Sequence, residues 1–596
     1  MMKRIFLVAA IFLACAPSFA QQNINIGTDA DALINSYMGQ NALFDVTNAY
    51  LNMLEYLYPE RATLAGIDRA NGTLDERTLK AEQARRSQIT EIKDMLSKIS
   101  RRKLAQSEKT DYDILSRSLD FDYYLVSRNR VQTSPLFYLA AQDAVYDVML
   151  KRINTINQYE NIEPRLKALP QVYRDAATNL KGAYKAENAL ALNKAYAAFT
   201  SLGDMDGFLK KNSGNDERAA LKVITDDTKA AMRQFFDKLK KIAKTAKPEP
   251  QKSPSYYEMA LKNQIQIDDS TSELTKLADA ALTKAKGNLL VMVKAYNLGK
   301  TPEVKDFYAI AAKVQGSPAY ERLLQTVGDE IKKANAAMAN VLPGSDMKVF
   351  VNHMPLFPAF LNPAFLFLPP YGTEHNLVGT LFIYTPPTKT GNPRAELNAY
   401  IQKHFTIPQI KLLVTENVVP GRQMFYSYSY DTKPIRRILG SNAVLDGWSA
   451  YAKHLAYEVG YLNTKDDALY LAFDDYARAV KALADLKLGA GTLDYEETVL
   501  FIMSQGISKE DAEMFTRQLA FNPGSAIGEL RGYTEIKALR KKYKAAQGEA
   551  FSLANFHNKI FFVGKVPVGA LAAEVENAYK VTKNMDLKNY TPNIGY

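Results

Sequence analysis

The stretch that decides the expected fold is Glu416-Asn417-Val418-Val419-Pro420-Gly421-Arg422-Gln423, in which a proline and a glycine interrupt a helical sequence. Proline removes a helical hydrogen bond, so this stretch is predicted to kink or bulge at Pro420-Gly421. A second stretch, Asp446-Gly447-Trp448-Ser449-Ala450-Tyr451-Ala452-Lys453, is predicted to form the partner helix. Asp446 and Lys453 are seven residues apart and therefore share one face of that helix. Trp448, the only tryptophan of the chain, is expected to pack the helix pair.

Together the two stretches resemble the paired signatures His-Glu-x-x-Pro-Gly-His-His and Glu-Gly-Trp-Ala-x-Tyr-Ala-Glu of domain of unknown function 885 (DUF885), a secreted, metallopeptidase-like family. Further fragments are similar to this family in the same order along most of the mature chain. They are Pro59-Glu60-Arg61-Ala62-Thr63-Leu64-Ala65-Gly66, Asp111-Tyr112-Asp113-Ile114-Leu115, Pro523-Gly524-Ser525-Ala526, Gly532 with Ile536, Leu539 and Arg540, Phe556-His557-Asn558, and Gly564-Lys565-Val566-Pro567. Each fragment is weak alone, and their shared order carries the resemblance.

The resemblance implies a helical peptidase with a zinc-activated water. Such a site needs neutral imidazoles and a carboxylate on the metal, with a glutamate as general base. The family's two histidine positions lie six or seven residues apart, roughly 9–10 Å along a straight helix, which is too far to share one metal comfortably. The intervening Pro-Gly must therefore bend the helix, and Pro420-Gly421 keeps that feature.

The residues that the family uses for zinc chemistry are replaced in this chain. Glu416 stands at the first histidine position, Arg422 and Gln423 at the later pair, Asn417 at the general base, Asp446 at the third ligand, Lys453 at a later glutamate, and Gly489 at the histidine that ends the stretch from Asp485. Glu529 takes the place of a tyrosine expected after Pro523-Gly524-Ser525-Ala526. An amide cannot take a proton from water, and an arginine opposes a metal ion. The sequence therefore predicts a degenerate site with no metal, no cofactor and no assigned catalytic residue.

The replacements also form a charge pattern. Arg422 and Lys453 add positive charge to a site that contains Glu416 and Asp446. Because buried carboxylates are costly unless paired, we expect the two cations to take the electrostatic place of the metal. The alternative is that all four side chains face solvent and have drifted since the function was lost.

The N-terminus has the pattern of a signal peptide. A basic start with Lys3 and Arg4, a short apolar run and Ala20 predict export with cleavage after residue 20. The apolar run is too short to span a bilayer. Cys15, the only cysteine, offers a less favoured alternative as a lipoprotein site. A chain cut after Ala20 has no cysteine, which excludes disulfides and thiolate chemistry.

The net charge of +11 falls to +9 without Lys3 and Arg4 and is diffuse apart from one cluster. That cluster comprises Lys238, Lys240, Lys241, Lys244 and Lys247, and we interpret it as a solvated helix face. The chain carries no nucleic-acid motif and, once exported, would not meet nucleic acid. No transmembrane segment is predicted.

The remaining pattern predicts a mainly α fold with two helical lobes around a central cleft and a minor β element near residues 379–384. The expected parts are a signal peptide (1–20), an N-terminal lobe (21–247) and a C-terminal lobe (255–596) that carries the degenerate site. The two lobes are separated by a break rich in proline and charge. The apolar, proline-rich run from 349 to 371 is interpreted as extended chain buried between the lobes, or alternatively as a wall of the cleft.

The predicted function is an exported, non-catalytic, peptidase-like protein that retains a cleft for a peptide or protein ligand. One alternative is an active metal-dependent peptidase with atypical ligands, such as His454 with Glu458 or Glu374 with His375. The other is a regulatory subunit of an intact paralogue. The sequence defines no oligomeric state, substrate or physiological role.

Overall fold

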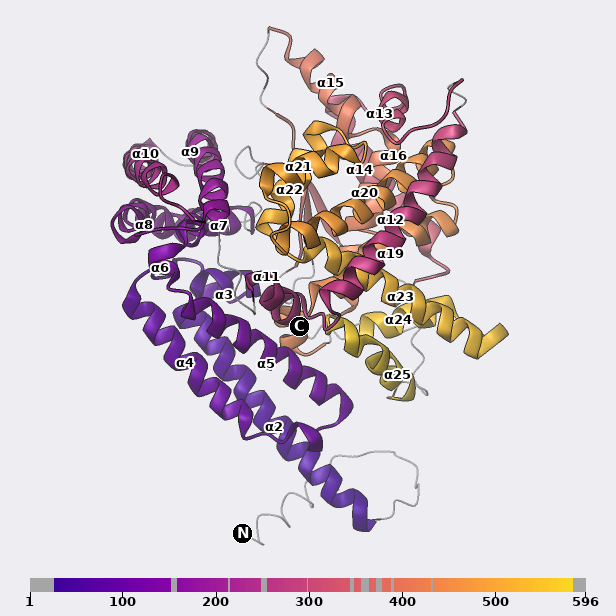
Figure 1. Ribbon diagram of the computed structural model, residues 1–596, viewed down its shortest axis with the longest axis horizontal. Helices are drawn as coiled ribbons and strands as arrows, with labels where there is room; N and C mark the ends of the chain where they lie inside the picture. Colours follow the sequence, from indigo (N-terminus) through magenta and orange to yellow (C-terminus); the bar gives the residue numbers. More distant parts are fainter. Residues whose placement is uncertain are drawn as a thin grey trace.

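The protein is predominantly helical with one small sheet, as predicted (Figure 1). The structure is a computed structural model that describes residues 26–151, 158–212, 215–247, 255–296, 299–342, 348–354, 364–370, 378–386, 388, 391–429 and 432–581. The signal peptide, Cys15, and residues 248–254 of the proline-rich break lie outside the described residues.

Two groups of helices form the N-terminal part of the described chain. The first contains α2 (Ile26–Leu57), α3 (Pro59–Ala65), α4 (Leu79–Ser97) and α5 (Gln106–Ser127), and the second contains α6 (Arg130–Thr133), α7 (Pro135–Lys151), α8 (Gln158–Asn179), α9 (Lys185–Asn212) and α10 (Asn215–Ala243). In α4, Ile89, Ile92 and Leu96 recur at helical spacing and are buried in the first core. Figure 1 shows the two groups as separate bundles, one above the other at the left of the view.

The C-terminal part is a larger helical body. Its helices are α11 (Tyr256–Met259), α12 (Thr271–Lys294), α13 (Asp306–Ala311), α14 (Leu323–Met338), α15 (Pro393–His404), α16 (Ile407–Asn417), α17 (Arg422–Tyr428), α18 (Pro434–Leu439), α19 (Asn442–Glu458), α20 (Lys465–Gly489), α21 (Tyr495–Ser504), α22 (Lys509–Phe521), α23 (Ser525–Gln547), α24 (Leu553–Val563) and α25 (Leu571–Val581). The main core of this body includes Trp448, Phe425 and Ile527. α18 is an exception, because Ile435 packs in the core formed by α2, α4 and α5.

A three-stranded sheet joins the C-terminal body to the second N-terminal bundle. Its strands are β1 (Val349–His353), β2 (Phe365–Leu368) and β3 (Gly379–Ile383) in the order β1-β3-β2, with β1 parallel and β2 antiparallel to β3. Successive side chains of a strand point to opposite faces. Leu381 and Ile383 therefore enter the C-terminal core, whereas Phe382 enters the core of α7 to α10. The β element predicted near 379–384 is β3, and the described parts of the run from 349 to 371 include β1 and β2.

Close contacts between glycines bring α19 and α23 together. A Cβ atom built on Gly532 would lie 1.9 Å from the carbonyl oxygen of Ala443, and one on Gly447 would lie 2.4 Å from the backbone of Gly532. Only glycine allows the two backbones to approach this closely. This contact fixes α19, which carries two of the predicted site residues, against α23.

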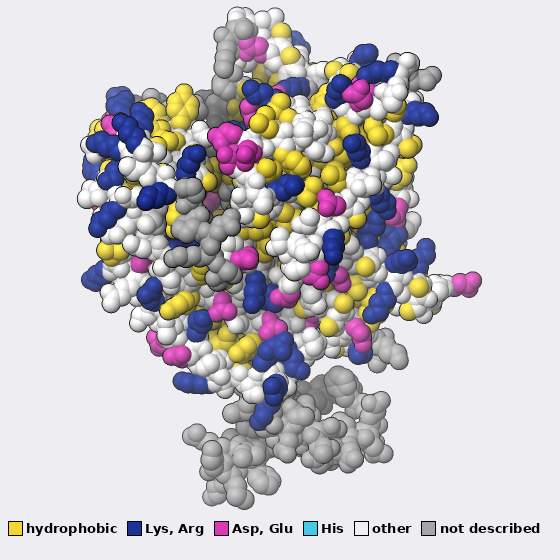
Figure 2. All heavy atoms as spheres, viewed as in Figure 1, with side chains coloured by type: hydrophobic (Ala, Val, Ile, Leu, Met, Phe, Trp, Pro, Cys, Tyr) yellow, Lys and Arg dark blue, Asp and Glu magenta, His cyan; other side chains and the backbone are white. Residues whose placement is uncertain are grey.

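The surface carries mixed charge. Basic and acidic side chains are interspersed over the face seen in Figure 2. Within the predicted lysine cluster, Lys240, Lys241, Lys244 and Lys247 are exposed, while Leu239 and Ile242 between them are buried. Lys240 and Lys241 are therefore on the solvated side of the end of α10, and Lys244 and Lys247 follow it in the chain. Within the described ranges, no helix has both the length and the apolar character needed to cross a membrane.

Candidate functional site

The helix that contains Pro420-Gly421 is interrupted completely at this point. α16 ends at Asn417 and α17 begins at Arg422, so the expected kink is a break between two helices. The indole Nε1 of Trp448 donates a hydrogen bond of 2.7 Å to the carbonyl oxygen of Pro420, which stabilises the break and ties it to α19. A Cβ on Gly421 would lie 1.9 Å from the carbonyl oxygen of Glu416, so this turn requires glycine.

The break brings Arg422 back against the end of α16. Its Nη1 donates 2.8 Å hydrogen bonds to Oε1 of Glu416 and to Oδ1 of Asn417. Its Nη2 and Nε lie 3.1 and 3.3 Å from Oδ1 of Asp446 on α19. Arg422 therefore lies between the two carboxylates that stand at predicted ligand positions.

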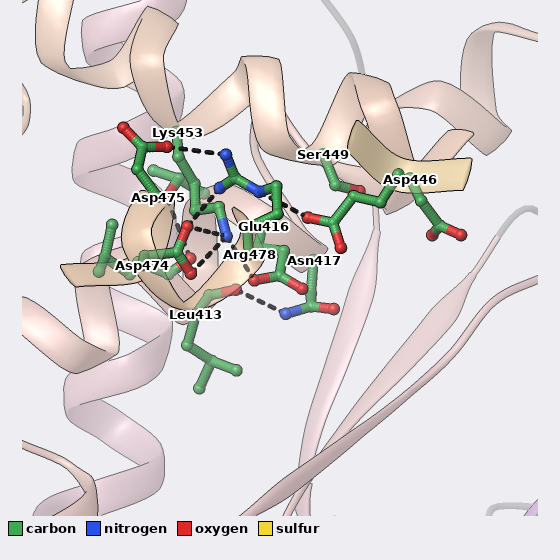
Figure 3. A network of polar contacts seen from close by, with 12 residues as sticks. Leu413, Glu416, Asn417, Asp446, Ser449, Lys453, Asp474, Asp475 and Arg478 are labelled. Atoms are coloured by element: carbon green, nitrogen blue, oxygen red, sulfur yellow. Dashed lines mark hydrogen bonds and ion pairs between the residues drawn. The ribbon is translucent and has the colours of Figure 1, made fainter. Parts of the chain in front are cut away.

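Lys453 continues this arrangement on the other side of Glu416. Its Nζ donates to Oε2 of Glu416 at 3.0 Å and to Oδ1 of Asp474 at 2.9 Å (Figure 3). Asp474 lies on α20 and also pairs with Arg478. Arg478 in turn donates to Oδ1 of Asp475 at 2.7 Å and to Oε1 of Glu529 on α23 at 2.8 Å.

We call these eight charged residues the ion-pair network: Glu416, Arg422, Asp446, Lys453, Asp474, Asp475, Arg478 and Glu529. It joins five helices, α16, α17, α19, α20 and α23. Lys453 and Arg478 are only 3% exposed, whereas the side chains of Glu416 and Asp446 are each 25% exposed. Lys453 and Arg478 are thus the buried centre, whereas Arg422, which is 22% exposed, and the two carboxylates are accessible to a ligand. With five carboxylates and three cations the network carries a formal charge of −2.

The pKa shifts follow from burial and pairing. Burial opposes ionisation of Glu416, but the charges of Lys453 and Arg422 outweigh it and hold the pKa of Glu416 well below its usual range. Burial would lower the pKa of Arg422, but Glu416 and Asp446 raise it above its ordinary value. For Asp446 burial dominates, and its pKa is raised despite Arg422. Arg422 and Glu416 are therefore a stable ion pair, and Asp446 is the carboxylate that most needs its partner.

The residues at this position do not fit a zinc ion. A guanidinium and an ammonium group lie between the carboxylates, where a metal would have to be bound. Asn417, at the general-base position, donates its amide N–H to the carbonyl of Leu413 at 3.0 Å, and its oxygen accepts from Arg422. In the part of the chain that the structure describes, no three His, Cys, Asp or Glu side chains are grouped so as to hold a metal.

Besides Asn417, two of the predicted positions lie outside the network. Gln423 is buried and donates to the carbonyl oxygen of Lys348 and to Oγ of Ser427. Gly489, at the end of α20, packs against the ring of Tyr257, where a Cβ would lie 2.2 Å from the ring. Asp485 earlier in that stretch accepts hydrogen bonds from the backbone N–H groups of Gly524, Ala526 and Ile527, and so caps α23.

Asp474, Asp475 and Arg478 were not predicted as site residues. They occur as Asp-Asp-x-x-Arg, with the arginine three and four residues after the acids, so that all three share one face of α20. Such a pattern is common on solvated helices, and the signal that could have distinguished it is the absence of lysine and glutamate from the rest of that helix turn. Glu529 was noted as a replacement for tyrosine, and its partner is Arg478.

The histidines considered for a relocated metal site have other partners. Nε2 of His454 lies 2.9 Å from Oδ1 of Asp475, and Glu458 pairs with Arg540 at 2.6 Å, so these two residues do not converge. Glu374 and His375 lie outside the described residues. His557 is buried, with Nδ1 2.7 Å from the carbonyl oxygen of Val341 and Nε2 2.8 Å from the hydroxyl of Tyr451. Burial lowers the pKa of His557 to about 3, which keeps it neutral.

Comparisons with known proteins give a family and a fold. Residues 59–575 match the model of a family described as "Bacterial protein of unknown function (DUF885)". A solved structure from Colwellia psychrerythraea, described as a "putative lipoprotein", is 19% identical with a TM-score of 0.73, over 91% of this chain and 99% of that one. Another from Shewanella oneidensis, described as a "putative lipoprotein of unknown function", is 17% identical with a TM-score of 0.69, over 89% and 99%. No curated protein matches the chain.

Proposed function

Because the chain belongs to the DUF885 family of bacterial proteins of unknown function, we propose that it is an exported, non-catalytic member that binds a peptide or protein ligand. The observation that carries the proposal is the position of Arg422 and Lys453 on either side of Glu416. These cations supply the positive charge that carboxylates need in a partly buried site, so the fold does not depend on a metal. Neither cation can activate a water as a zinc ion does, and Asn417 cannot serve as a base.

Binding is the activity that this arrangement can still support. The side chains of Glu416, Arg422 and Asp446 are each between 22% and 25% exposed, so a ligand can reach them. Ionised groups form strong hydrogen bonds with the amides and charged groups of peptides. The network is held by five helices, which gives a ligand a preorganised surface.

We expect the purified protein to retain no stoichiometric zinc after incubation with the metal and dialysis. Elemental analysis measures zinc per chain, and a tryptic digest of casein analysed by mass spectrometry shows whether any peptide is cleaved. The expected result is an unchanged set of peptides, some of which are retained by the immobilised protein. One tightly held zinc per chain, or cleavage that a chelator abolishes, would refute the proposal and favour the metal-dependent peptidase.

We propose that the chain is exported and processed either by cleavage after Ala20 or by lipidation of Cys15. The two similar structures carry the description of lipoproteins, which supports Cys15 as the modified residue. Membrane fractions of cells labelled with a fatty-acid analogue test this. Label and membrane association that are lost in Cys15→Ala would establish the lipoprotein, whereas unlabelled protein cut after Ala20 would establish a free exported protein.

A further inference from the structure

A cavity of about 200 Å³ lies between the N-terminal helices and the last two helices of the chain, away from the ion-pair network. Residues of α5, of the end of α17, of the segment that contains α18, of α24 and of α25 line it. None of the network residues is among them. The cavity is large enough for one side chain or a small molecule, and neither the family nor the proposed function assigns it a ligand.

One side of the cavity is aromatic. Phe561 stacks on Tyr428 with ring centroids 5.3 Å apart, and both rings line the cavity. Phe562 is beside them and is 44% exposed, which is high for a large apolar residue. Phe561 and Tyr428 are only 1% and 7% exposed, so an aromatic or branched apolar group placed there would mainly cover Phe562, which is favourable in proportion to the area covered.

The charged groups at the cavity differ in exposure. Arg436 and Glu574 both line it but are paired with each other at 3.0 Å and are 6% and 3% exposed. Arg436 also pairs with Asp111, which is 1% exposed. Lys433 pairs with the same Asp111 at 2.7 Å, yet its side chain is 51% exposed. The carboxylates are therefore shielded, and Lys433 is the charged group that a ligand would meet.

We propose that this cavity binds a carboxylate that is attached to an aromatic or branched apolar group, with the carboxylate on Lys433 and the apolar group against Phe561, Phe562 and Tyr428. The C-terminal residue of a peptide and a free aromatic acid share this chemistry. Because Nζ of Lys433 has hydrogens beyond the one directed at Asp111, it can make a charge-assisted hydrogen bond to the ligand without breaking its existing pair.

A tryptophan beside the cavity can report ligand binding by its fluorescence. Trp448, the only tryptophan, packs on Phe561 with ring centroids 4.7 Å apart. A ligand that moves Phe561 should therefore change the fluorescence of the protein when tryptophan alone is excited. Phenylalanine derivatives do not absorb at that wavelength, so they can be titrated without interference.

We expect N-acetylphenylalanine to give a saturable change in fluorescence and to bind about tenfold more tightly than N-acetylphenylalaninamide, since the amide lacks the charge. Lys433→Met should weaken binding of the acid about tenfold and leave the amide unaffected. Lys433→Arg should keep the preference for the acid, and Phe562→Ala should weaken both ligands. Lys544→Met, an exposed lysine at the end of α23, is the matched control and should change nothing.

Equal affinity for acid and amide, or no saturation by either, would overturn the proposal. Circular dichroism and melting temperature show whether each variant is folded, and Phe562→Ala provides a second test if Lys433→Met is not. A peptide ending in Ala-Ala-Phe with a free carboxylate identifies the source: tighter binding than N-acetylphenylalanine points to peptide C-termini, and equal binding to free aromatic acids. Failure here leaves the proposed function untouched, because that function is tested by zinc content, hydrolysis and retention of peptides, and it is placed on the ion-pair network, which does not line this cavity.

Discussion

Arg422→Ala is expected to lower the free energy of unfolding by about 2–3 kcal/mol, measured by urea denaturation at pH 7. The substitution leaves Glu416 with Lys453 alone and removes the ion-pair partner of Asp446, whose pKa burial already raises. The value is below that of a fully buried pair because the side chain of Arg422 is 22% exposed. If Arg422 stabilises the two carboxylates, its removal should therefore lower the free energy of unfolding measurably.

The double variant Arg422→Ala/Asp446→Asn separates pairing from simple loss of packing. Removing the unpaired carboxylate should recover about 1 kcal/mol or more of the loss, since an unpaired charge is the costly species. Arg69→Ala is the control, because Arg69 pairs with Glu55 but its side chain is 80% exposed, and a loss of no more than about 0.5 kcal/mol is expected. Equal losses in the single and double variants would contradict the idea that the cation replaces a metal.

The ion pair between Glu416 and Arg422 predicts a pH dependence of stability. The folded-state pKa of Glu416 lies below its unfolded value, so the pairing contributes stability above an unfolded pKa of about 4.3 and loses it as the pH falls towards the folded pKa. The difference in the free energy of unfolding between the wild type and Arg422→Ala should become smaller as the pH is lowered below about 4. A difference that is constant from pH 7 to pH 3 would mean that Arg422 acts through packing.

The helical fold and the charged pairs at the site could be predicted because both depend on local pattern. The spacing of Ile89, Ile92 and Leu96 identifies a buried helix face, and the short run from Gly379 identifies the central strand of the sheet. Opposite charges at Glu416 and Arg422 indicated pairing because the family resemblance places both residues in one site, on either side of Pro420-Gly421. In each case a few neighbouring residues carry the information.

The full extent of the network could not be predicted because it depends on helices that are distant in the sequence. Asp474 meets Lys453 only because α20 contacts α19, and Glu529 joins from α23 through Arg478. The local sequence of α20 offers only the absence of lysine and glutamate around Asp474 as a sign that this face is covered. Gly489 was predicted as a site position because of its place in a family motif. In the structure it packs under the ring of Tyr257, outside the network.

Gly532→Ala is expected to lower the free energy of unfolding by about 3 kcal/mol or more, measured by urea denaturation. The new Cβ would lie 1.9 Å from the carbonyl oxygen of Ala443, and because a backbone atom cannot rotate away, α19 and α23 must separate. Their separation would also pull Glu529 on α23 away from Arg478 on α20. This ion pair ties α23 to the rest of the network.

Gly287→Ala provides the matched control for this change. Gly287 lies within α12, and a Cβ there would meet nothing within 4 Å. Alanine is the better helix former by roughly 0.5–1 kcal/mol, so Gly287→Ala should leave stability unchanged or raise it. The two substitutions are chemically identical and both lie in helices, so any difference in their sign comes from the contact between α19 and α23. If Gly532→Ala were as well tolerated as Gly287→Ala, the close approach of these helices, and with it the rigid support of the ion-pair network, would be wrong.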